Sequence, residues 1–236
     1  PGREPAPAPP PATLSVVEPR QRWRLTYARP SPATAGDVGR DYATSWEEAL
    51  RQAGLPIATM DAVRPRLSFG APLPTGIEGR AELIELWLTD RLPAWRVREG
   101  LEPALPVGHR LVDLENVWLG APALPGRITG AVYLITLGTA DEPRLAAAVQ
   151  RLMAADRLPR ERQKGGTTRT YDLRPLIADL VLEPDAASPT LRLTTRIHPE
   201  LGSGRPDEVL AALAEAAGVP LDVTAIVRER LILSGD

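Results

Sequence analysis

Residues 128–137 read Ile-Thr-Gly-Ala-Val-Tyr-Leu-Ile-Thr-Leu, and residues 141–145 read Asp-Glu-Pro-Arg-Leu. The first run is rich in β-branched and apolar residues and predicts a strand. The second predicts the start of a helix, with Asp as the capping residue and Pro in the first turn. Apolar residues then recur at helical spacing, at Leu145, Val149, Leu152 and Met153. A strand followed by an amphipathic helix is therefore the unit from which the fold is built.

The same reading extends to the end of the chain. The expected elements are a polar hairpin at 159–172, strands around 176–183 and 190–196, a helix at 206–217 and a strand at 221–233. Gly218 and Pro220 end that helix. With the polar hairpin as an insertion, the second half has the order β-α-β-β-α-β.

The first half predicts the same order. The expected elements are a strand at 23–27, a helix beginning at Asp37 or Ser45, strands at 66–69 and 82–88, a helix around 93–103 and a strand around 109–118. Ser45 and Glu48 have the spacing of a capping box. Gly54 and Pro56 end the first helix.

Two successive β-α-β-β-α-β units predict an α+β fold of two tandem ferredoxin-like units with antiparallel sheets. We expect the first unit to span 23–120 and the second 127–233. Residues 1–22 contain the run Pro5-Ala6-Pro7-Ala8-Pro9-Pro10-Pro11, which favours an extended, disordered linker.

Composition excludes several kinds of chemistry. The chain has no cysteine, which excludes disulfides, thiolate zinc sites and iron–sulfur ligation by this chain. Its two histidines, His109 and His198, fall in different halves, and we expect neither a metal nor a cofactor. No apolar run approaches the length of a membrane span and no signal peptide is visible, so we expect a cytoplasmic protein.

The loop from Gly70 to Gly79 is the first candidate site. It holds three Gly and two Pro between two strands, and Gly allows a ligand to approach main-chain N–H groups. Its candidate ligand residues are Ser68, Gly70, Gly76, Glu78 and Glu82. The alternative is a long connection that needs unusual backbone angles.

Charged residues flank this loop. Glu82 and Glu85 point to opposite faces of a strand, so a solvated face with a charge that blunts a sheet edge is the favoured explanation. Arg64 and Arg66 share a face of the preceding strand. They could reach an anion, or form a cross-strand ion pair with Glu82.

The segment 157–170 carries the strongest local charge. Gly165-Gly166 predicts a hairpin turn. Its basic residues, Arg160, Arg162, Lys164 and Arg169, could contact RNA phosphates, or simply keep the hairpin soluble.

Three stretches together resemble a known family. They are Ala49-Leu50-Arg51-Gln52-Ala53-Gly54-Leu55-Pro56, the segment from Pro65 to Glu82 that contains Arg66-Leu67-Ser68-Phe69-Gly70, and Tyr171-Asp172-Leu173-Arg174-Pro175-Leu176-Ile177. Their order and spacing resemble the bacterial radical SAM-linked proteins of unknown function. That resemblance implies an accessory domain of a radical SAM enzyme, encoded beside it or fused to it. Family members carry Ser-His-Leu-Asp in the first helix, where this chain has Val38-Gly39-Arg40-Asp41.

We therefore expect a non-catalytic accessory domain that acts with a radical SAM protein and binds RNA, as tRNA or rRNA, or the ribosome. Two alternatives remain open. One is a metal-free enzyme that processes or modifies RNA, and the other is a structural domain that only docks its enzyme.

Overall fold

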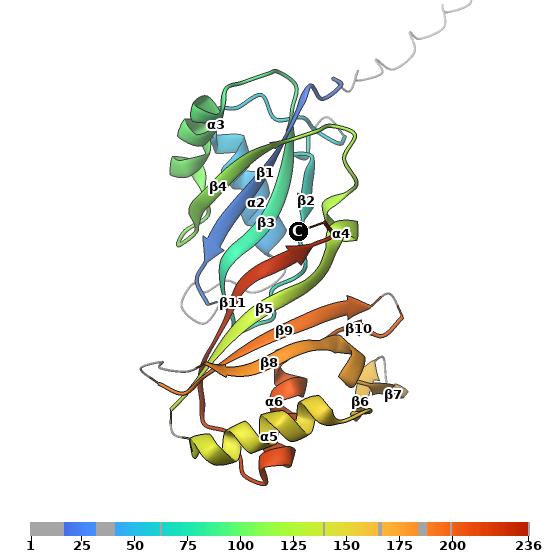
Figure 1. Ribbon diagram of the computed structural model, residues 1–236. Helices are drawn as coiled ribbons and strands as arrows, with labels where there is room; N and C mark the ends of the chain where they lie inside the picture. The colour runs from blue at the N-terminus through green and yellow to red at the C-terminus, as the bar shows by residue number, and fades with distance from the viewer. Residues whose placement is uncertain are drawn as a thin grey trace, which may run out of the picture.

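Strands with alternating apolar residues run through both halves of the chain, and the computed structural model joins them into one sheet (Figure 1). The structure describes residues 17–31, 41–61, 63–138, 140–164, 167–183, 188–198 and 200–235. Residues 1–16 of the expected linker and Val38-Gly39-Arg40 lie outside this range.

The first half contains four strands, two main helices and a short 3-10 turn. In chain order these are β1 (Gln21–Arg29), α2 (Asp41–Gln52), β2 (Leu67–Phe69), β3 (Glu78–Leu88), α3 (Ala94–Leu101), η1 (Glu102–Ala104) and β4 (Arg110–Val117). A single turn, α4 (Leu124–Arg127), leads into the second half.

The second half is longer because it carries an extra hairpin. In chain order its elements are β5 (Ile128–Leu137), α5 (Glu142–Ala154), β6 (Pro159–Lys164), β7 (Thr167–Asp172), η2 (Arg174–Leu176), β8 (Ile177–Glu183), β9 (Thr190–His198), β10 (Gly202–Ser203), α6 (Pro206–Ala217) and β11 (Val223–Leu233).

The expected order of the main elements is confirmed in both halves, while the structure adds the short elements η1, α4, η2 and β10 and shifts some element ends. Helix α2 begins at Asp41, so Ser45 lies within it and the capping box expected there is wrong. Strand β1 begins at Gln21, so the last two residues of the expected linker belong to the sheet. Asp141 caps α5 as expected, because its side chain accepts a hydrogen bond from the Arg144 amide. Gly218 ends α6 with a φ of 68°, a left-handed conformation that glycine adopts without strain.

The nine-stranded sheet has the order β10-β9-β5-β11-β3-β1-β4, with β2 also pairing with β3 and β8 with β9. Within the halves the orders are β4-β1-β3-β2 and β11-β5-β9-β8, with every pair antiparallel. The expectation of antiparallel sheets needs one correction, because β11 pairs in parallel with β3 through Val227–Glu78 and Arg228–Gly79. That pairing joins the halves into a mixed, mostly antiparallel sheet.

Each half has its own hydrophobic core. In the first, Trp46 and Leu50 of α2 pack with Leu25 of β1 and Ile84 of β3. In the second, the expected stripes of α5 and α6 pack against β5, β8 and β9. Figure 1 shows α2 and α3 with the upper half and α5 and α6 with the lower half. The helix pairs thus leave the middle of the sheet, around β11 and β3, between them.

The helices are short. Among the described residues, none is both long enough and apolar enough to cross a membrane.

Candidate functional site

Strand β3 carries two carboxylates that the structure buries on opposite faces of the sheet. Glu82 is 3% exposed and Glu85 is fully buried. The prediction of a solvated face is therefore wrong for both. The physical reason is that β3 is an inner strand, and arginines from its neighbours β1 and β11 compensate each carboxylate.

Glu82 pairs with Arg228 of β11, across the seam between the two halves. Arg228 donates Nε–H to Glu82 Oε1 at 2.8 Å and also donates from Nη2 to Oε2. Its other donors reach the loop that follows β2, at Pro72 O (3.0 Å) and Ala71 O (2.8 Å). Burial lowers the pKa of Arg228, but the hydrogen bonds and charge of Glu82 outweigh burial and leave that pKa above its usual value. Arg228 therefore stays charged and holds the loop over the sheet.

The backbone makes room for this pair at Gly79. A Cβ there would lie 2.6 Å from Glu82 Cγ and 2.7 Å from its Oε1. Only a residue without a side chain leaves Glu82 in the position where it meets Arg228.

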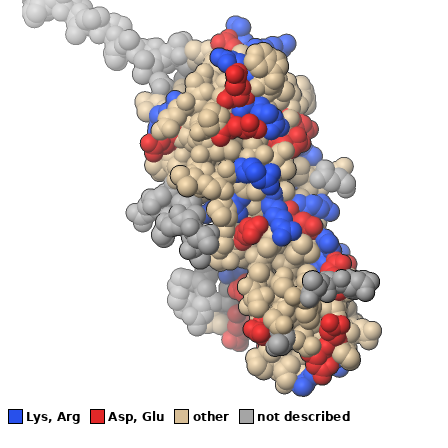
Figure 2. All heavy atoms as spheres, turned by 90° about the vertical axis from the view of Figure 1, so that its left-hand side faces the viewer, with Lys and Arg blue, Asp and Glu red and all other residues tan. Residues whose placement is uncertain are grey.

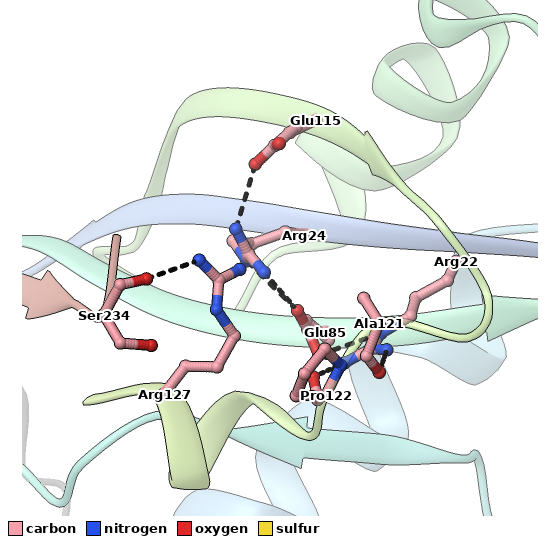
Figure 3. Close-up of polar contacts among 8 residues, drawn as sticks. All are labelled: Arg22, Arg24, Glu85, Glu115, Ala121, Pro122, Arg127 and Ser234. Atoms are coloured by element: carbon pink, nitrogen blue, oxygen red, sulfur yellow. Dashed lines mark hydrogen bonds and ion pairs between the residues drawn. The ribbon is translucent and has the colours of Figure 1, made fainter. Parts of the chain in front are cut away.

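A similar set of ion pairs and hydrogen bonds lies on the other face of the sheet, around Glu85 (Figure 3). Arg22 donates to Glu85 Oε2 at 2.5 Å, and Arg24 donates to Oε1 at 2.9 Å. The remaining donors of Arg22 reach Ala121 O (2.7 Å) and Pro122 O (3.0 Å). Here too a buried arginine joins a β3 carboxylate to the carbonyls of an Ala-Pro pair.

Around this cluster, Arg24 also contacts Glu115, which is largely exposed, at 3.1 Å. Arg127 donates to Ser234 O at 3.1 Å, and Figure 3 shows its guanidinium beside that of Arg24. The cluster thereby connects β1, β3, the turn before β5 and the end of β11. Glu85, Arg22 and Arg24 are buried and join a strand pair to the loop at Ala121 and Pro122, so we describe the cluster as a structural clamp.

A cleft of about 760 Å³ opens beside Arg228, where the loop after β2 meets the first turn of α6. Its walls are mainly aliphatic, and its lining includes Leu73, Ile77, Ala131, Ile197, Ile226 and Leu231. Tyr133 lines the cleft beside Arg228, and its pKa is raised, first by burial, although Arg228 opposes that shift. Arg205 and Asp207 also line the cleft, at the start of α6. This is a concave, apolar site with a few polar groups, the usual form of a ligand site.

The predicted loop forms one wall of this cleft. Residues 71–77, including Gly76, line it, and Glu82 lies beneath through its pair with Arg228. Gly70 instead packs tightly, because a Cβ there would lie 3.0 Å from the Leu231 side chain. Ser68 pairs in register with Glu85, and Glu78 is partly exposed at 3.8 Å from Arg80. Of the five predicted residues, only Gly76 lines the cleft; Glu82 is joined to it through Arg228, and Ser68, Gly70 and Glu78 lie outside it.

Arg64 and Arg66 do not join this site. Both precede β2, which begins at Leu67, so the expected shared strand face is wrong. Arg64 forms an exposed ion pair with Asp61 at 2.7 Å. The Arg66 guanidinium lies 4.7 Å from the ring centre of Trp87. Neither reaches Glu82, whose partner is Arg228.

The basic hairpin forms a separate two-stranded sheet of β6 and β7. Its register pairs Arg162 with Arg169 and Lys164 with Thr167. Arg160 is not free, because it donates to Glu215 of α6 at 2.8 Å. The side chains of Arg162, Lys164 and Arg169 lie outside the described part of the structure, so their role as phosphate contacts stays a prediction.

The two histidines contribute to local structure. His109 stacks on Tyr27 with a ring separation of 5.7 Å, and His198 Nδ1 accepts from the amides of Glu200 and Leu201. In the part of the chain that the structure describes, no group of three His, Asp or Glu side chains is placed to hold a metal ion.

Sequence reasoning missed the arginines that matter most, Arg22, Arg24 and Arg228. A signal was present, because Gly-Ala-Pro occurs at 70–72 and again at 120–122, and both copies supply the carbonyls that these arginines bind. Arg205 and Asp207 carried no such signal, because their place beside the loop follows only from the tertiary fold.

Comparison with known proteins places the chain in a family. No curated protein matches the sequence. One solved chain, from "Crystal Structure of a Cbf5-Nop10-Gar1 Complex", is 13% identical with a TM-score of 0.47, over 89% of this chain and 48% of that one. The chain thus spans about half the length of that solved chain. A family model described as "Uncharacterized protein conserved in bacteria (DUF2344)" matches residues 38–207, which is most of the folded part. The chain belongs to this uncharacterised bacterial family.

Proposed function

We propose that this chain is a non-catalytic accessory domain that acts with a radical SAM enzyme and holds part of an RNA substrate, tRNA or rRNA. The observation that carries the proposal is the cleft of about 760 Å³, whose walls are mainly aliphatic and whose lining includes Arg228, a cation that the buried Glu82 neutralises. Because Glu82 neutralises Arg228, and Arg228 also binds two carbonyls of the loop, this charge is compensated within the protein and an uncharged group can pack against the apolar walls. The link to a radical SAM enzyme rests on the resemblance of the three sequence stretches.

The order of the strands within each half supports a further proposal about the fold. Each half places its fourth main strand beside its first, then its third, then its second, with antiparallel neighbours. This is the order of a ferredoxin-like unit, and we propose that the chain contains two in tandem. Folds of this kind serve many functions, so the cleft rather than the fold supports the binding role.

The distribution of surface charge favours RNA binding at a few local sites over binding across one continuous basic face. The net charge is −2, and Figure 2 shows basic side chains gathered at mid-height with acidic ones beside them. An RNA partner would therefore be held at particular sites, such as the cleft and the β6–β7 hairpin.

The test combines the chain with labelled tRNA and rRNA fragments, and with a radical SAM enzyme from the same organism. We expect salt-sensitive RNA binding by fluorescence anisotropy and a stable complex with the enzyme by sedimentation. We also expect the RNA to remain intact and unmodified when the chain acts alone. Cleavage or modification by the isolated chain would favour the enzyme alternative, and enzyme binding without RNA binding would favour the docking alternative.

A matched pair of variants locates the binding. Ile226 lines the cleft, whereas Val181 of β8 is 41% exposed and lies outside it. Ile226→Trp should fill the cleft and weaken RNA binding, and Val181→Trp should not. Equal effects of the two variants would remove the cleft from the proposal.

A further inference from the structure

We propose that the cleft binds one unpaired ribonucleotide, with its base between the aliphatic walls, its phosphate at Arg205 and its ribose 2′-hydroxyl at Asp207. This inference rests on the proposed function and names the chemistry of the site. Each part of the nucleotide corresponds to a different group in the cleft.

The walls suit a flat, uncharged base. The cleft volume of about 760 Å³ falls in the range of roughly 300–1,000 Å³ that small-molecule sites occupy. Leu73, Ile197 and Ile226 contribute apolar side chains to the lining of the cleft. Sequence-specific RNA recognition commonly targets unstacked bases, which proteins contact by packing on their faces and by hydrogen bonds to their edges.

Two arginines line the cleft, and they differ in their partners: Arg228 is paired with Glu82, whereas Arg205 is not paired among the described residues. Arg228 is fully used by Glu82 and by the carbonyls of Ala71 and Pro72. Arg205 is exposed, lines the cleft, and has no hydrogen-bond or ion-pair partner among the described residues. A guanidinium without a partner is available to pair with a phosphate, which it can bind through two donors.

Asp207 supplies the complementary acceptor. It lies two residues after Arg205, lines the same cleft, and has no hydrogen-bond or ion-pair partner in the described part of the chain. A carboxylate repels phosphate but accepts hydrogen bonds from ribose hydroxyls. The 2′-hydroxyl is the group that distinguishes RNA from DNA, so Asp207 would make the cleft selective for RNA.

A peptide terminus is the strongest competing ligand, since its carboxylate and ammonium groups could also meet Arg205 and Asp207. A single amino acid would leave much of the cleft empty, whereas a nucleotide supplies a base, a sugar and a phosphate along its length. We therefore favour the nucleotide and include the peptide as an outcome of the test.

The experiment measures anisotropy of a labelled four-nucleotide single strand, made as RNA and as DNA of the same sequence, at one fixed ionic strength. Wild type should bind the RNA several-fold more tightly than the DNA. Arg205→Gln should weaken both by about tenfold, the loss of one charge-assisted contact. Asp207→Ala should remove the preference for RNA, so that the variant binds the RNA and DNA strands with equal affinity.

The matched control is Arg230→Gln, because Arg230 of β11 is exposed and lies outside the cleft. Thermal unfolding of every variant confirms that it is folded. Equal RNA and DNA affinity in wild type, or equal effects of Arg205→Gln and Arg230→Gln, would overturn the inference. So would competition by an unlabelled hydrophobic dipeptide but not by nucleotides.

Failure of this inference can be separated from failure of the proposed function. If intact tRNA binds while the tetranucleotide and the cleft variants show no effect, the accessory role stands and the nucleotide site is wrong. If neither tRNA, rRNA nor the tetranucleotide binds, both are wrong.

Discussion

Arg22 and Arg228 are each 2% exposed, and each is held by a carboxylate of β3. Removing two charges from water costs about as much as their attraction returns, so such pairs contribute little net stability. These pairs instead fix the positions of the groups around them, because a planar guanidinium with five donors binds several acceptors at once. In both cases those acceptors include two successive carbonyls of a loop.

Removing Glu85 should be far more damaging than removing an exposed charge. Glu85→Ala leaves the guanidiniums of Arg22 and Arg24 buried without their shared carboxylate. We expect the free energy of unfolding in urea to fall by about 3–5 kcal/mol. Arg64→Ala removes an exposed ion pair and should leave the urea midpoint nearly unchanged. Similar midpoints for the two variants would mean that the Glu85 cluster is not a clamp.

The tyrosines make the fold sensitive to alkaline pH. Burial, with the neighbouring Tyr42, raises the pKa of Tyr27 well above its usual value, and burial raises the pKa of Tyr133. A raised folded-state pKa gives stability that is complete below the unfolded pKa of about 10 and is lost as pH rises above it. Tyr27→Phe should therefore flatten the fall in unfolding free energy between about pH 9.5 and pH 11, measured by urea titration. An unchanged slope would show that Tyr27 ionises as freely in the folded protein as in the unfolded chain.

The sequence predicts apolar core positions well and buried charges poorly. Leu145, Val149 and Leu152 were predicted to share a helix face by their spacing, and all three are at most 8% exposed. Glu82 and Glu85 were expected in solvent, because an isolated strand does not reveal which strand will lie beside it. Their partners come from β1 and β11, up to 146 residues away in the chain.

Two segments of irregular chain are fastened to the sheet in the same way. The loop after β2 is held by Arg228, and the loop before α4 by Arg22. The first of these loops forms a wall of the cleft, so its position decides the shape of the candidate site.

Gly79 provides a direct test of this loop. Gly79→Ala should push Glu82 away from Arg228, since the new Cβ would lie 2.6 Å from Glu82 Cγ. We expect a loss of about 1–3 kcal/mol in unfolding free energy and faster proteolysis of residues 71–77. Gly126→Ala is the matched control, because a Cβ there meets nothing within 4 Å. Equal proteolysis of the two variants would contradict the role of Arg228 as a latch.

The β6–β7 hairpin is the second element with a predicted role. Replacing Arg162, Lys164 and Arg169 with Gln should weaken RNA binding, and each lost phosphate contact should reduce the log–log salt slope by about 0.7 for a single strand. Stability should change little, because the hairpin pairs only with itself in the described sheets. A salt slope identical to wild type would remove the hairpin from the RNA surface.

Local signals explain why the elements could be predicted and some of their ends could not. The strand at 128–137 and the helix at 206–217 were predicted with the bounds observed, since alternation, stripes, Pro and Gly are local. Two starts were predicted for the first helix, and the one at Ser45 is wrong because Ser45 lies inside α2, although Ser45 and Glu48 have capping-box spacing; Asp37 lies outside the described residues.

The two halves are one sheet because β11 of the second half lies beside β3 of the first. Only two register pairs make that contact, and the Arg228–Glu82 pair reinforces it. The sequence predicted two units but not that they share one sheet. The parallel pairing of β11 with β3 joins strands that are distant in the chain, so it leaves no local pattern in the sequence.

Because β11 and β3 join the halves, we expect the two cores to unfold together. Tryptophan fluorescence can report on the unfolding of one half. All five tryptophans, Trp23, Trp46, Trp87, Trp95 and Trp118, lie in the first half, so their fluorescence follows that half alone. Circular dichroism follows both halves. Leu213→Asp buries a charge in the second core, where Leu213 is fully buried, and should lower stability by several kcal/mol.

If the seam couples the halves, Leu213→Asp should move the fluorescence and dichroism midpoints in urea by the same amount, as Leu50→Asp in the first core should. Replacing both Glu82 and Arg228 with Met puts apolar side chains in place of the ion pair. It also removes the hydrogen bonds that hold the loop after β2. We expect the two midpoints to move apart in that double variant, because it loses the buried ion pair between β11 and β3, while their two register pairs and the packing of Ile77 and Leu83 in the second core remain. A fluorescence midpoint that ignores Leu213→Asp in the otherwise unchanged protein would show instead that the halves are independent folding units that merely share a sheet.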